Sequence, residues 1–287
     1  MKRWRWAIAL LIVVGTTFGL LALAYRVYAP GDLAARLERL QARWSVFGQL
    51  GIWRGLFRGL VITLELAVVS VVLSLVIAIV LALLRLAPNA RLRAPLPGAA
   101  VISRGVGVLV EVVRSSPLFM LIIFMFIGLP RLGIDLSPFV AGVTALTLYT
   151  SCVTSEIVRA GILSLERGQF DAALSLGLGY FGRLRFVVLP QALRRMVPAI
   201  VSQLVTLIKD TSLVAYITVV ELFRRAQILG QFANNLIETY IVVMAIYFVI
   251  NFALSQLSRR LEIRQGRVGR AKAPAAIGAE DQVPSVV

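Results

Sequence analysis

The residues most able to do chemistry are charged and hydroxyl side chains that interrupt long apolar stretches. Lys209 and Asp210, followed by Thr211 and Ser212, stand in an apolar region of about residues 187–222. A charge at membrane depth costs about 2.5–3.5 kcal/mol, so it usually faces a cavity or a partner charge. On a helix the two neighbours diverge by about 100° and need not pair. They predict either a transport path or gate, or structural ion pairs with another helix.

A second apolar segment, about residues 138–158, has a polar side that includes Tyr149 and Thr150. Such a side could line a path for a zwitterion, but small hydroxyl residues also join helices in lipid. Glu65 stands in a third apolar segment, where it either contributes to the path or reaches the membrane interface. The sequence leaves both pairs of alternatives open.

Enzyme chemistry is not predicted for this chain. It has no histidine, which excludes histidine acid–base catalysis and histidine metal ligation. The single cysteine, Cys152, cannot form an intrachain disulfide. No G-x-x-x-x-G-K-[ST] phosphate-binding loop occurs, so ATP hydrolysis is expected in another chain. We predict no catalytic residue, no metal site and no cofactor bound by this chain.

Composition indicates a membrane protein. Of 287 residues, 59% are hydrophobic, and the mean hydropathy is +0.87, more apolar surface than a soluble chain of this size could bury. The net charge of +16 is distributed between the apolar runs. This distribution is typical of cytoplasmic loops and contact with anionic lipid. Nucleic-acid binding is not predicted, because no basic motif with interleaved aromatic residues occurs.

Six apolar segments are long enough to span a bilayer. Their approximate bounds are 7–25, 60–84, 107–129, 138–158, 187–222 and 237–257. The first segment could alternatively be a signal peptide, although no clear cleavage site closes it. We therefore predict an all-α, polytopic membrane protein with about six transmembrane helices.

Positive charge predicts the orientation of these spans. The basic loops at residues 85–104 and 159–195 and the basic C-terminal segment are expected in the cytoplasm, together with both termini. Residues 26–58 disagree, since they carry six arginines but fall outside in this topology. Within them, residues 32–44 predict an amphipathic helix on a membrane surface.

The loop between the fourth and fifth spans, about residues 159–190, has a specific pattern. Residues 169–176 can form two helical turns, after which Gly177 can adopt a left-handed C-terminal cap. A second helix can start near Tyr180 and run towards Pro190. Such a helix–turn–helix could fit a groove on a soluble partner, or it could be an ordinary interfacial amphipathic helix.

The full spacing of this loop resembles the Glu-Ala-Ala coupling loop of ATP-binding-cassette (ABC) importer permeases. The residues that carry the resemblance are Asp171, Ala172, Ala173, Gly177, Leu189 and Pro190. From residue 59 to about residue 260 the chain resembles permeases of the polar amino-acid uptake family. The further matching segments are 59–66, 111–118, 156–162, 189–194 and 209–213, the last being among the more family-specific.

The resemblance implies a permease subunit with a five-helix core plus one N-terminal helix, in a bacterial-type inner membrane. It implies domains at 1–58 (N-terminal helix and amphipathic segment), 59–260 (permease) and 261–287 (disordered basic cytoplasmic tail). The implied partners are cytoplasmic ABC ATPase subunits that use ATP and Mg, a second permease copy or paralogue, and an extracytoplasmic solute-binding protein. The six loop residues would couple the permease to the ATPase.

Departures from the family pattern concern the solute more than the fold. Asp171 replaces the usual glutamate, and residues 149–152 differ in a mid-span stretch, so solute preference is the property least defined by the resemblance. Two other classes remain as alternatives: a structural or signalling membrane protein, and a membrane-embedded enzyme.

Overall fold

The computed structural model describes residues 15–16, 18–19, 22–23, 33–89 and 97–271. Every regular element in this part of the chain is helical. Most of the predicted first span, residues 7–25, lies outside the described residues. The chain divides into two compact units, Met1–Leu50 and Gly51–Val287, which are described separately.

The first unit contains helix α2, Leu33–Ser45, followed by a 3₁₀ turn, Val46–Gly48. The helix predicted over residues 32–44 is therefore confirmed from Leu33 onwards. Leu37, Leu40 and Trp44 recur at helical spacing and form its apolar stripe. The Trp44 ring lies 5.5 Å from that of Phe47, measured between centroids. Its location on a membrane surface stays a prediction.

The longest helix, α3, runs from Leu50 to Leu86. It begins ten residues before the predicted start of the second span, so residues 50–59 are part of this helix. Its buried positions are mostly small: Gly59, Thr63, Ala67, Ser70, Ser74, Ala78 and Ala82. Small residues let helices approach closely where lipid offers no hydrophobic driving force, and the larger valine and leucine side chains are left facing outwards.

The third predicted span, residues 107–129, is not one straight helix. Helix α4, Ala99–Ser115, and helix α5, Leu118–Ile123, belong to segments that meet at 101°. Ser116 is extended (φ −81°, ψ 140°) because a residue that precedes proline is disfavoured in the helical region. A π-helical turn, Phe124–Gly128, and a 3₁₀ turn, Leu129–Leu132, complete the second arm.

Helix α6, Pro138–Leu163, confirms a helix at the fourth predicted span. Ser137 caps it, since its hydroxyl accepts the N–H of Val140. Helix α7, Arg167–Ser175, and the short helix α8, Tyr180–Gly182, follow.

A π-helical stretch, Arg183–Val188, then leads without a break into helix α9, Leu189–Asp210. The two prolines of α9 do not interrupt the helix. Pro190 lies in its first turn, directly after the π-helical stretch, and Pro198 lies inside it. The Ser258 hydroxyl donates to the Pro198 carbonyl at 2.9 Å. The real interruption follows Asp210, where a 3₁₀ stretch, Thr211–Ile217, begins.

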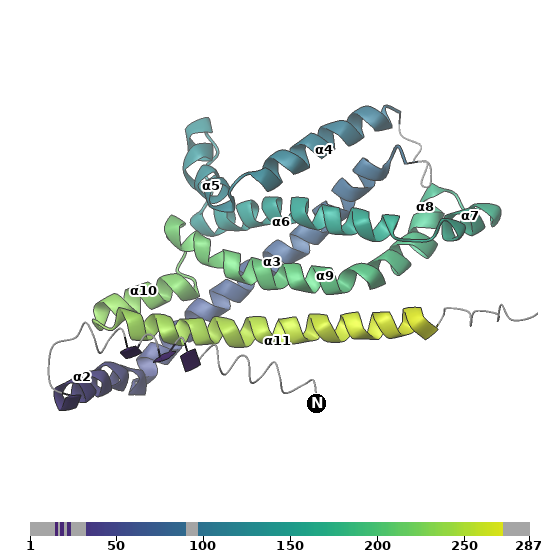
Figure 1. The fold of residues 1–287 in the computed structure, drawn as a ribbon. Coiled ribbons are helices and arrows are strands. Elements are labelled where there is room, and N and C mark those ends of the chain that lie inside the picture. Colours follow the sequence, from purple (N-terminus) through teal and green to yellow (C-terminus); the bar gives the residue numbers. More distant parts are fainter. Residues whose placement is uncertain (1–14, 17, 20–21, 24–32, 90–96, 272–287) are drawn as a thin grey trace, which may run out of the picture. The chain divides into compact units, whose positions relative to one another are not determined.

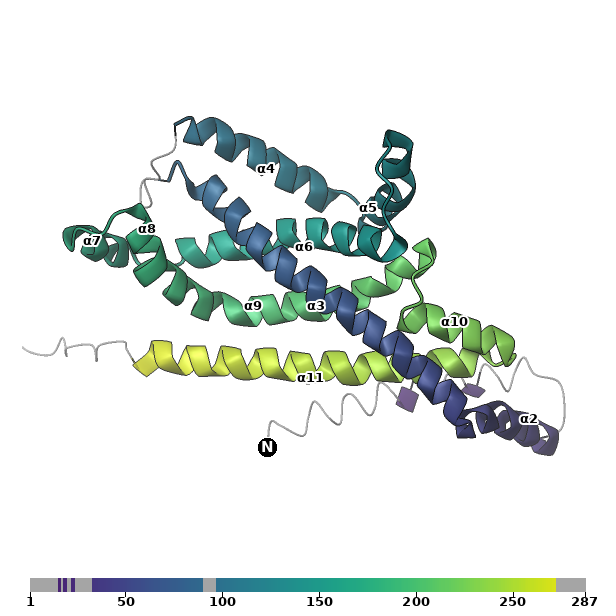
Figure 2. The ribbon, with the colours of Figure 1, turned by 180° about the vertical axis from the view of Figure 1, so that it is seen from behind.

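Helix α10, Leu222–Phe232, follows the 3₁₀ stretch, and helix α11 runs from Leu236 to Ala271. Residues 261–271, predicted to be part of a disordered tail, are therefore helical, while residues 272–287 lie outside the described residues. Helix α9 packs against α6 and α11, and α4 packs against α6 (Figures 1 and 2).

Three helical segments of the described chain are long and apolar enough to cross a membrane: Leu50–Leu86, Tyr180–Ile217 and Leu236–Leu261. The bent pair formed by α4 and α5 would be a fourth. The hydroxyl-rich α6 is not among them, so the predicted number of six spans stays a prediction.

Candidate functional site

The turn after α7 has the conformation predicted from the sequence. Gly177 has φ +72°, a region that strongly favours glycine. Its N–H donates to the Leu174 carbonyl at 2.9 Å, and the Leu178 N–H donates to the Ala173 carbonyl at 3.2 Å. These two bonds form a Schellman cap, which satisfies carbonyls at the end of the helix.

Buried side chains hold α7 against the base of α9. Phe170 is 3% exposed and Ala173 is 2% exposed. Phe170 belongs to one hydrophobic cluster with Ile162, Leu184 and Val188. The Gln191 side-chain amide also donates to the Gln169 side-chain oxygen at 2.8 Å. The segment formed by α7 and α8 is thus attached to the start of α9 by both apolar and polar contacts.

The outer surface of this segment is exposed and apolar. Asp171, Ala172 and Gly177 are exposed, as is Pro190, while Leu189 is half-buried and Ala173 faces the core. Leu176 and Phe181 are each 78% exposed, although the sequence argument did not select them. Exposed apolar side chains clustered on one segment are typical of a protein–protein contact.

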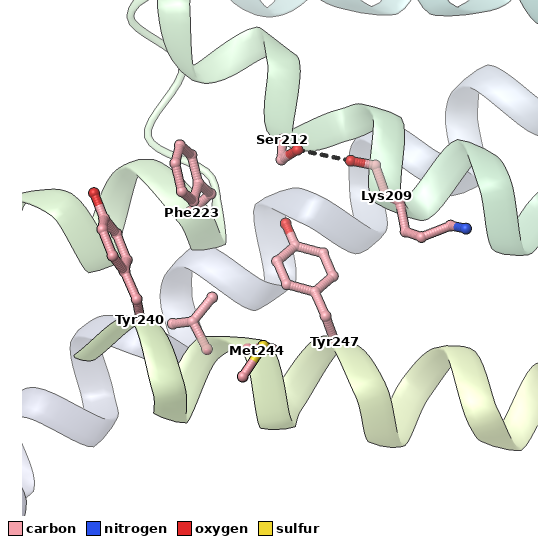
Figure 3. A pocket seen from close by; sticks show the side chains of 7 residues that line it. Lys209, Ser212, Phe223, Tyr240, Met244 and Tyr247 are labelled. Atoms are coloured by element: carbon pink, nitrogen blue, oxygen red, sulfur yellow. Dashed lines mark hydrogen bonds between the residues drawn. The ribbon is translucent and has the colours of Figure 1, made fainter. Parts of the chain in front are cut away.

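A cavity of about 370 Å³ lies at the other end of α9 (Figure 3). Its lining consists of one cation, one hydroxyl residue, three aromatic rings and two apolar side chains: Lys209, Ser212, Phe223, Tyr240, Tyr247, Val243 and Met244. The rings of Phe223 and Tyr240 are stacked, with centroids 5.6 Å apart. Aromatic faces and an ammonium group together can accept both ends of a zwitterion.

Only part of the predicted 209–212 cluster lines this cavity. The Thr211 hydroxyl is buried and donates to the Ile208 carbonyl at 2.7 Å, and the Ser212 hydroxyl donates to the Lys209 carbonyl at 2.7 Å. Asp210 and Thr211 are absent from the lining. Within the described chain neither Lys209 nor Asp210 forms an ion pair. Only Lys209 of the two lines the cavity, as expected for neighbouring side chains that point in different directions from a helix.

The structure does not bring the remaining predicted path residues to this cavity. Tyr149 packs against Val110, Val113 and Cys152, and Thr150 on α6 is buried. Glu65 is exposed on α3. Because α3 begins at Leu50, Glu65 lies well inside the helix. Whether it contributes to the path or reaches the membrane interface stays a prediction.

The sequence argument missed a buried carboxylate, Glu221, which is 0% exposed. It caps α10: its two oxygens accept the N–H groups of Arg224 at 2.7 Å and Phe223 at 2.9 Å. The Tyr247 hydroxyl donates to it at 3.1 Å and the Thr63 hydroxyl lies at 3.3 Å. Its position directly before a helix was a signal in the sequence that could have identified Glu221 as a capping residue.

Gly59 allows α3 to reach this carboxylate. A Cβ atom there would lie 3.0 Å from the Leu222 Cα and 3.1 Å from the Glu221 carbonyl oxygen, both tighter than ordinary contact. The Thr63 hydroxyl, one turn later, also lies 3.0 Å from the Leu222 N–H. Since Tyr247 both binds Glu221 and lines the cavity, the cavity wall is connected to α3 and α10 through this carboxylate.

Comparison with known protein families matches residues 98–267 to the binding-protein-dependent transport system inner membrane components. That range covers α4 to α11, including both ends of α9. The chain belongs to this family. It is also 47% identical over 168 residues to a Bacillus subtilis protein named "probable glutamine ABC transporter permease protein GlnP", covering 58% of this chain and 77% of that protein.

Other similar proteins are also named as amino-acid transport permeases or ABC transporters. The L-cystine transport system permease protein TcyB of Bacillus subtilis is 39% identical over 163 residues, which cover 56% of this chain and 69% of the relative. A solved amino acid ABC transporter is similar with a TM-score of 0.63 and 28% identity, covering 82% of this chain and all of that one. The MetNI methionine ABC transporter, at 23% identity and a TM-score of 0.60, shares the fold; 74% of this chain and 99% of that chain are covered.

Membership of this family identifies the general class of this protein. It is an ABC importer permease of the amino-acid type, an inner-membrane component whose family implies an ATPase partner.

Proposed function

We propose that this permease carries a polar amino acid across the inner membrane, driven by ATP hydrolysis in separate cytoplasmic ABC ATPase subunits. The observation that carries the proposal is the α7–α8 segment: a glycine-capped helix with exposed Leu176 and Phe181, joined to α9 by a hydrogen bond between Gln169 and Gln191. ATP and Mg belong to the partner, since this sequence contains no phosphate-binding loop.

The coupling residues have distinct roles in this proposal. Ala173 seats α7 on the core, while the exposed Asp171 and Ala172 face the ATPase. Gly177 turns the chain so that the α7 end and α8 enter one groove on the partner. Leu189 and Pro190 begin α9, so a push on the segment is transmitted along α9 towards Lys209 at its far end.

The Lys209 cavity contributes to the solute path. Its ammonium group offers a partner for a carboxylate, and the Tyr240, Tyr247 and Phe223 rings offer faces for an amino group. A second permease copy or paralogue would complete the path, and an extracytoplasmic solute-binding protein would deliver the amino acid. Tyr149, Thr150 and Glu65 act elsewhere, at helix contacts or on the exposed face of α3.

The test of transport is uptake into proteoliposomes that contain the full chain, the ATPase and the binding protein encoded by neighbouring reading frames. Labelled glutamine, cystine, arginine and glutamate are supplied separately. ATP-dependent accumulation of at least one of them is expected. Failure of all four, with an assembled complex and a binding protein that retains its ligand, would overturn the amino-acid assignment.

Lys209→Met and Asp210→Asn separate a path role from a structural role. A path or gate role predicts a near-normal yield of complex but reduced solute-stimulated ATP hydrolysis per complex. A structural ion pair instead predicts a loss of about 3–5 kcal/mol and a low yield, because a buried charge is left alone. Normal solute-stimulated ATP hydrolysis per complex would show that the substituted residue has no role in the path.

Orientation is tested with single cysteines in a Cys152→Ala background. Cysteines at Ala94 and Ala273, which lie outside the described residues, should be shielded from an impermeant thiol reagent in intact cells. A cysteine at Ser137, the cap of α6, should be labelled. Labelling at Ala94 would reverse the topology, and the arginines of residues 26–58 would then have predicted it better.

A further inference from the structure

A second cavity, of about 430 Å³, lies where α3 ends, α4 begins and α6 ends. Three arginines from these three helices line it: Arg85, Arg104 and Arg159. Figures 1 and 2 show these helix ends on the same side of the unit as α7 and α8. Nothing in the proposed transport path or coupling contact uses this cavity.

Two of the three guanidinium groups are held in place by one carboxylate. One Glu156 oxygen forms an ion pair with Arg85, and the other is 2.9 Å from both Nε and Nη2 of Arg159. The Glu156–Arg159 pair lies within α6, but the Arg85 contact joins helices far apart in the chain. Because a fixed guanidinium loses little entropy when it binds a second acceptor, the cavity is preorganised.

The cavity has excess positive charge. Three arginines against Glu156 leave a formal surplus of two charges (3 − 1) among these four residues. Arg104 is exposed, and within the described chain it forms no ion pair. The nearby Glu111 lies 3.9 Å from Arg114, so that pair adds no net charge. Like charges gathered in one cavity favour an anionic ligand.

The shape around Arg85 also leaves room. Gly107 on α4 presents no side chain, and a Cβ there would lie 3.7 Å from the Arg85 Nε. The Ser103 hydroxyl donates to the Arg85 backbone carbonyl at 2.8 Å, which fixes α4 beside the end of α3. The Arg85 side chain lines the cavity and is 23% exposed, while its backbone is held.

We propose that this cavity binds a phosphate group. Planar guanidinium forks match phosphate oxygens through paired hydrogen bonds, and basic cavities between membrane helices on the cytoplasmic side bind anionic headgroups. The phosphate could come from an anionic lipid or from a soluble phosphate compound. Exposed Val101 and Val108 on α4, beside Arg104, favour the lipid, because its acyl chains would lie along them. This site is independent of the proposed transport function.

The test measures phosphate ligands on the purified full chain by native mass spectrometry. Phosphatidylglycerol and phosphatidylcholine are supplied in equal amounts, with and without inorganic phosphate. Arg104→Gln is the variant, since Arg104 is exposed and Glu156 still holds Arg85 and Arg159. Arg131→Gln is the matched control, because Arg131 is exposed but lies in the 3₁₀ turn after α5.

Retention of phosphatidylglycerol over phosphatidylcholine, reduced about tenfold by Arg104→Gln and unchanged by Arg131→Gln, supports a lipid headgroup. Binding of inorganic phosphate without any lipid preference, lost in the same variant, supports a soluble phosphate source. Equal retention of both lipids with no phosphate binding would overturn the proposal. Equal effects of the two variants would also overturn it, because they would indicate only general surface charge.

Discussion

The α7–α8 segment and the Glu221 cluster lie at opposite ends of α9, and different kinds of contact hold them (Figure 1). The cap at Gly177 uses hydrogen bonds between residues no more than five apart. The Glu221 cluster joins Thr63 on α3, Glu221 at the cap of α10 and Tyr247 on α11, and the first two are 158 positions apart in the sequence. One end is defined by local chain geometry, and the other by tertiary contacts.

This difference predicts how each end responds to substitution. A local cap can fail without disturbing the rest of the molecule, since its atoms contact few other elements. A buried carboxylate shared by three helices cannot be removed without leaving several donors unsatisfied. We therefore expect loss of folded protein at the Glu221 end, and loss of coupling with normal folding at the Gly177 end.

Replacement of Glu221 with alanine should give the largest effect. It leaves the Tyr247 hydroxyl and two backbone N–H groups without their acceptor, at about 1–3 kcal/mol for each buried group. The yield of folded protein and its melting temperature in detergent should fall steeply. Glu221→Gln keeps one acceptor oxygen and should fall between alanine and wild type. A wild-type melting temperature for Glu221→Ala would show that the cluster is not structural.

Gly59→Ala should give the next largest effect. The added methyl meets the backbone of Leu222 and Glu221 at about 3 Å, so α3 must move away from α10, at a cost of about 1–3 kcal/mol. Gly51→Ala in the same helix is the control, because no atom lies within 4 Å of the position of its Cβ. Equal melting temperatures for the two variants would contradict the close approach of the helices.

Local rules account for what the sequence predicted, and tertiary contacts account for what it did not. The Gly177 turn follows from a glycine placed directly after the two helical turns predicted at residues 169–176, and the start of α6 follows from Ser137 and Pro138. Pro117 could have predicted the bend at Ser116, but the apolar run continues through both residues and suggested a single span. Glu221 lay inside an apolar region, and its partners Thr63 and Tyr247 become visible only when three helices pack.

The same reasoning applies to the path residues. Lys209 was selected because a charge at depth needs a cavity, and a cavity is present beside it. Tyr149, Thr150 and Glu65 were selected for polarity alone, which does not define the direction in which a side chain faces. The sequence could not decide whether these side chains face the path, because that depends on which neighbouring helices α3 and α6 contact.

Gly177→Val tests the local end. A β-branched residue at φ +72° costs about 1–2 kcal/mol, yet no atom crowds that position. The chain should insert and fold normally but assemble poorly with the ATPase, as measured by copurification and stimulated ATP hydrolysis. Gly179→Val is the control, since Gly179 is extended at φ −64°, ψ 173°. Wild-type assembly and transport by Gly177→Val would refute the coupling role of this turn.

The smallest effect is expected at the hydrogen bond between Gln191 and Gln169, which attaches α7 to α9 from the outside. Both partners are polar and the bond is exposed, so its net contribution is about 0.5–1.5 kcal/mol. Gln169→Ala, Gln191→Ala and the double variant form a thermodynamic cycle, read from hydrogen exchange of the α7 amides. A coupling energy near zero would mean that Phe170 and the apolar cluster alone hold the segment. A coupling energy in the expected range, with ATP hydrolysis less responsive to solute in each variant, would indicate that stiffness at this joint transmits the movement of the ATPase into α9.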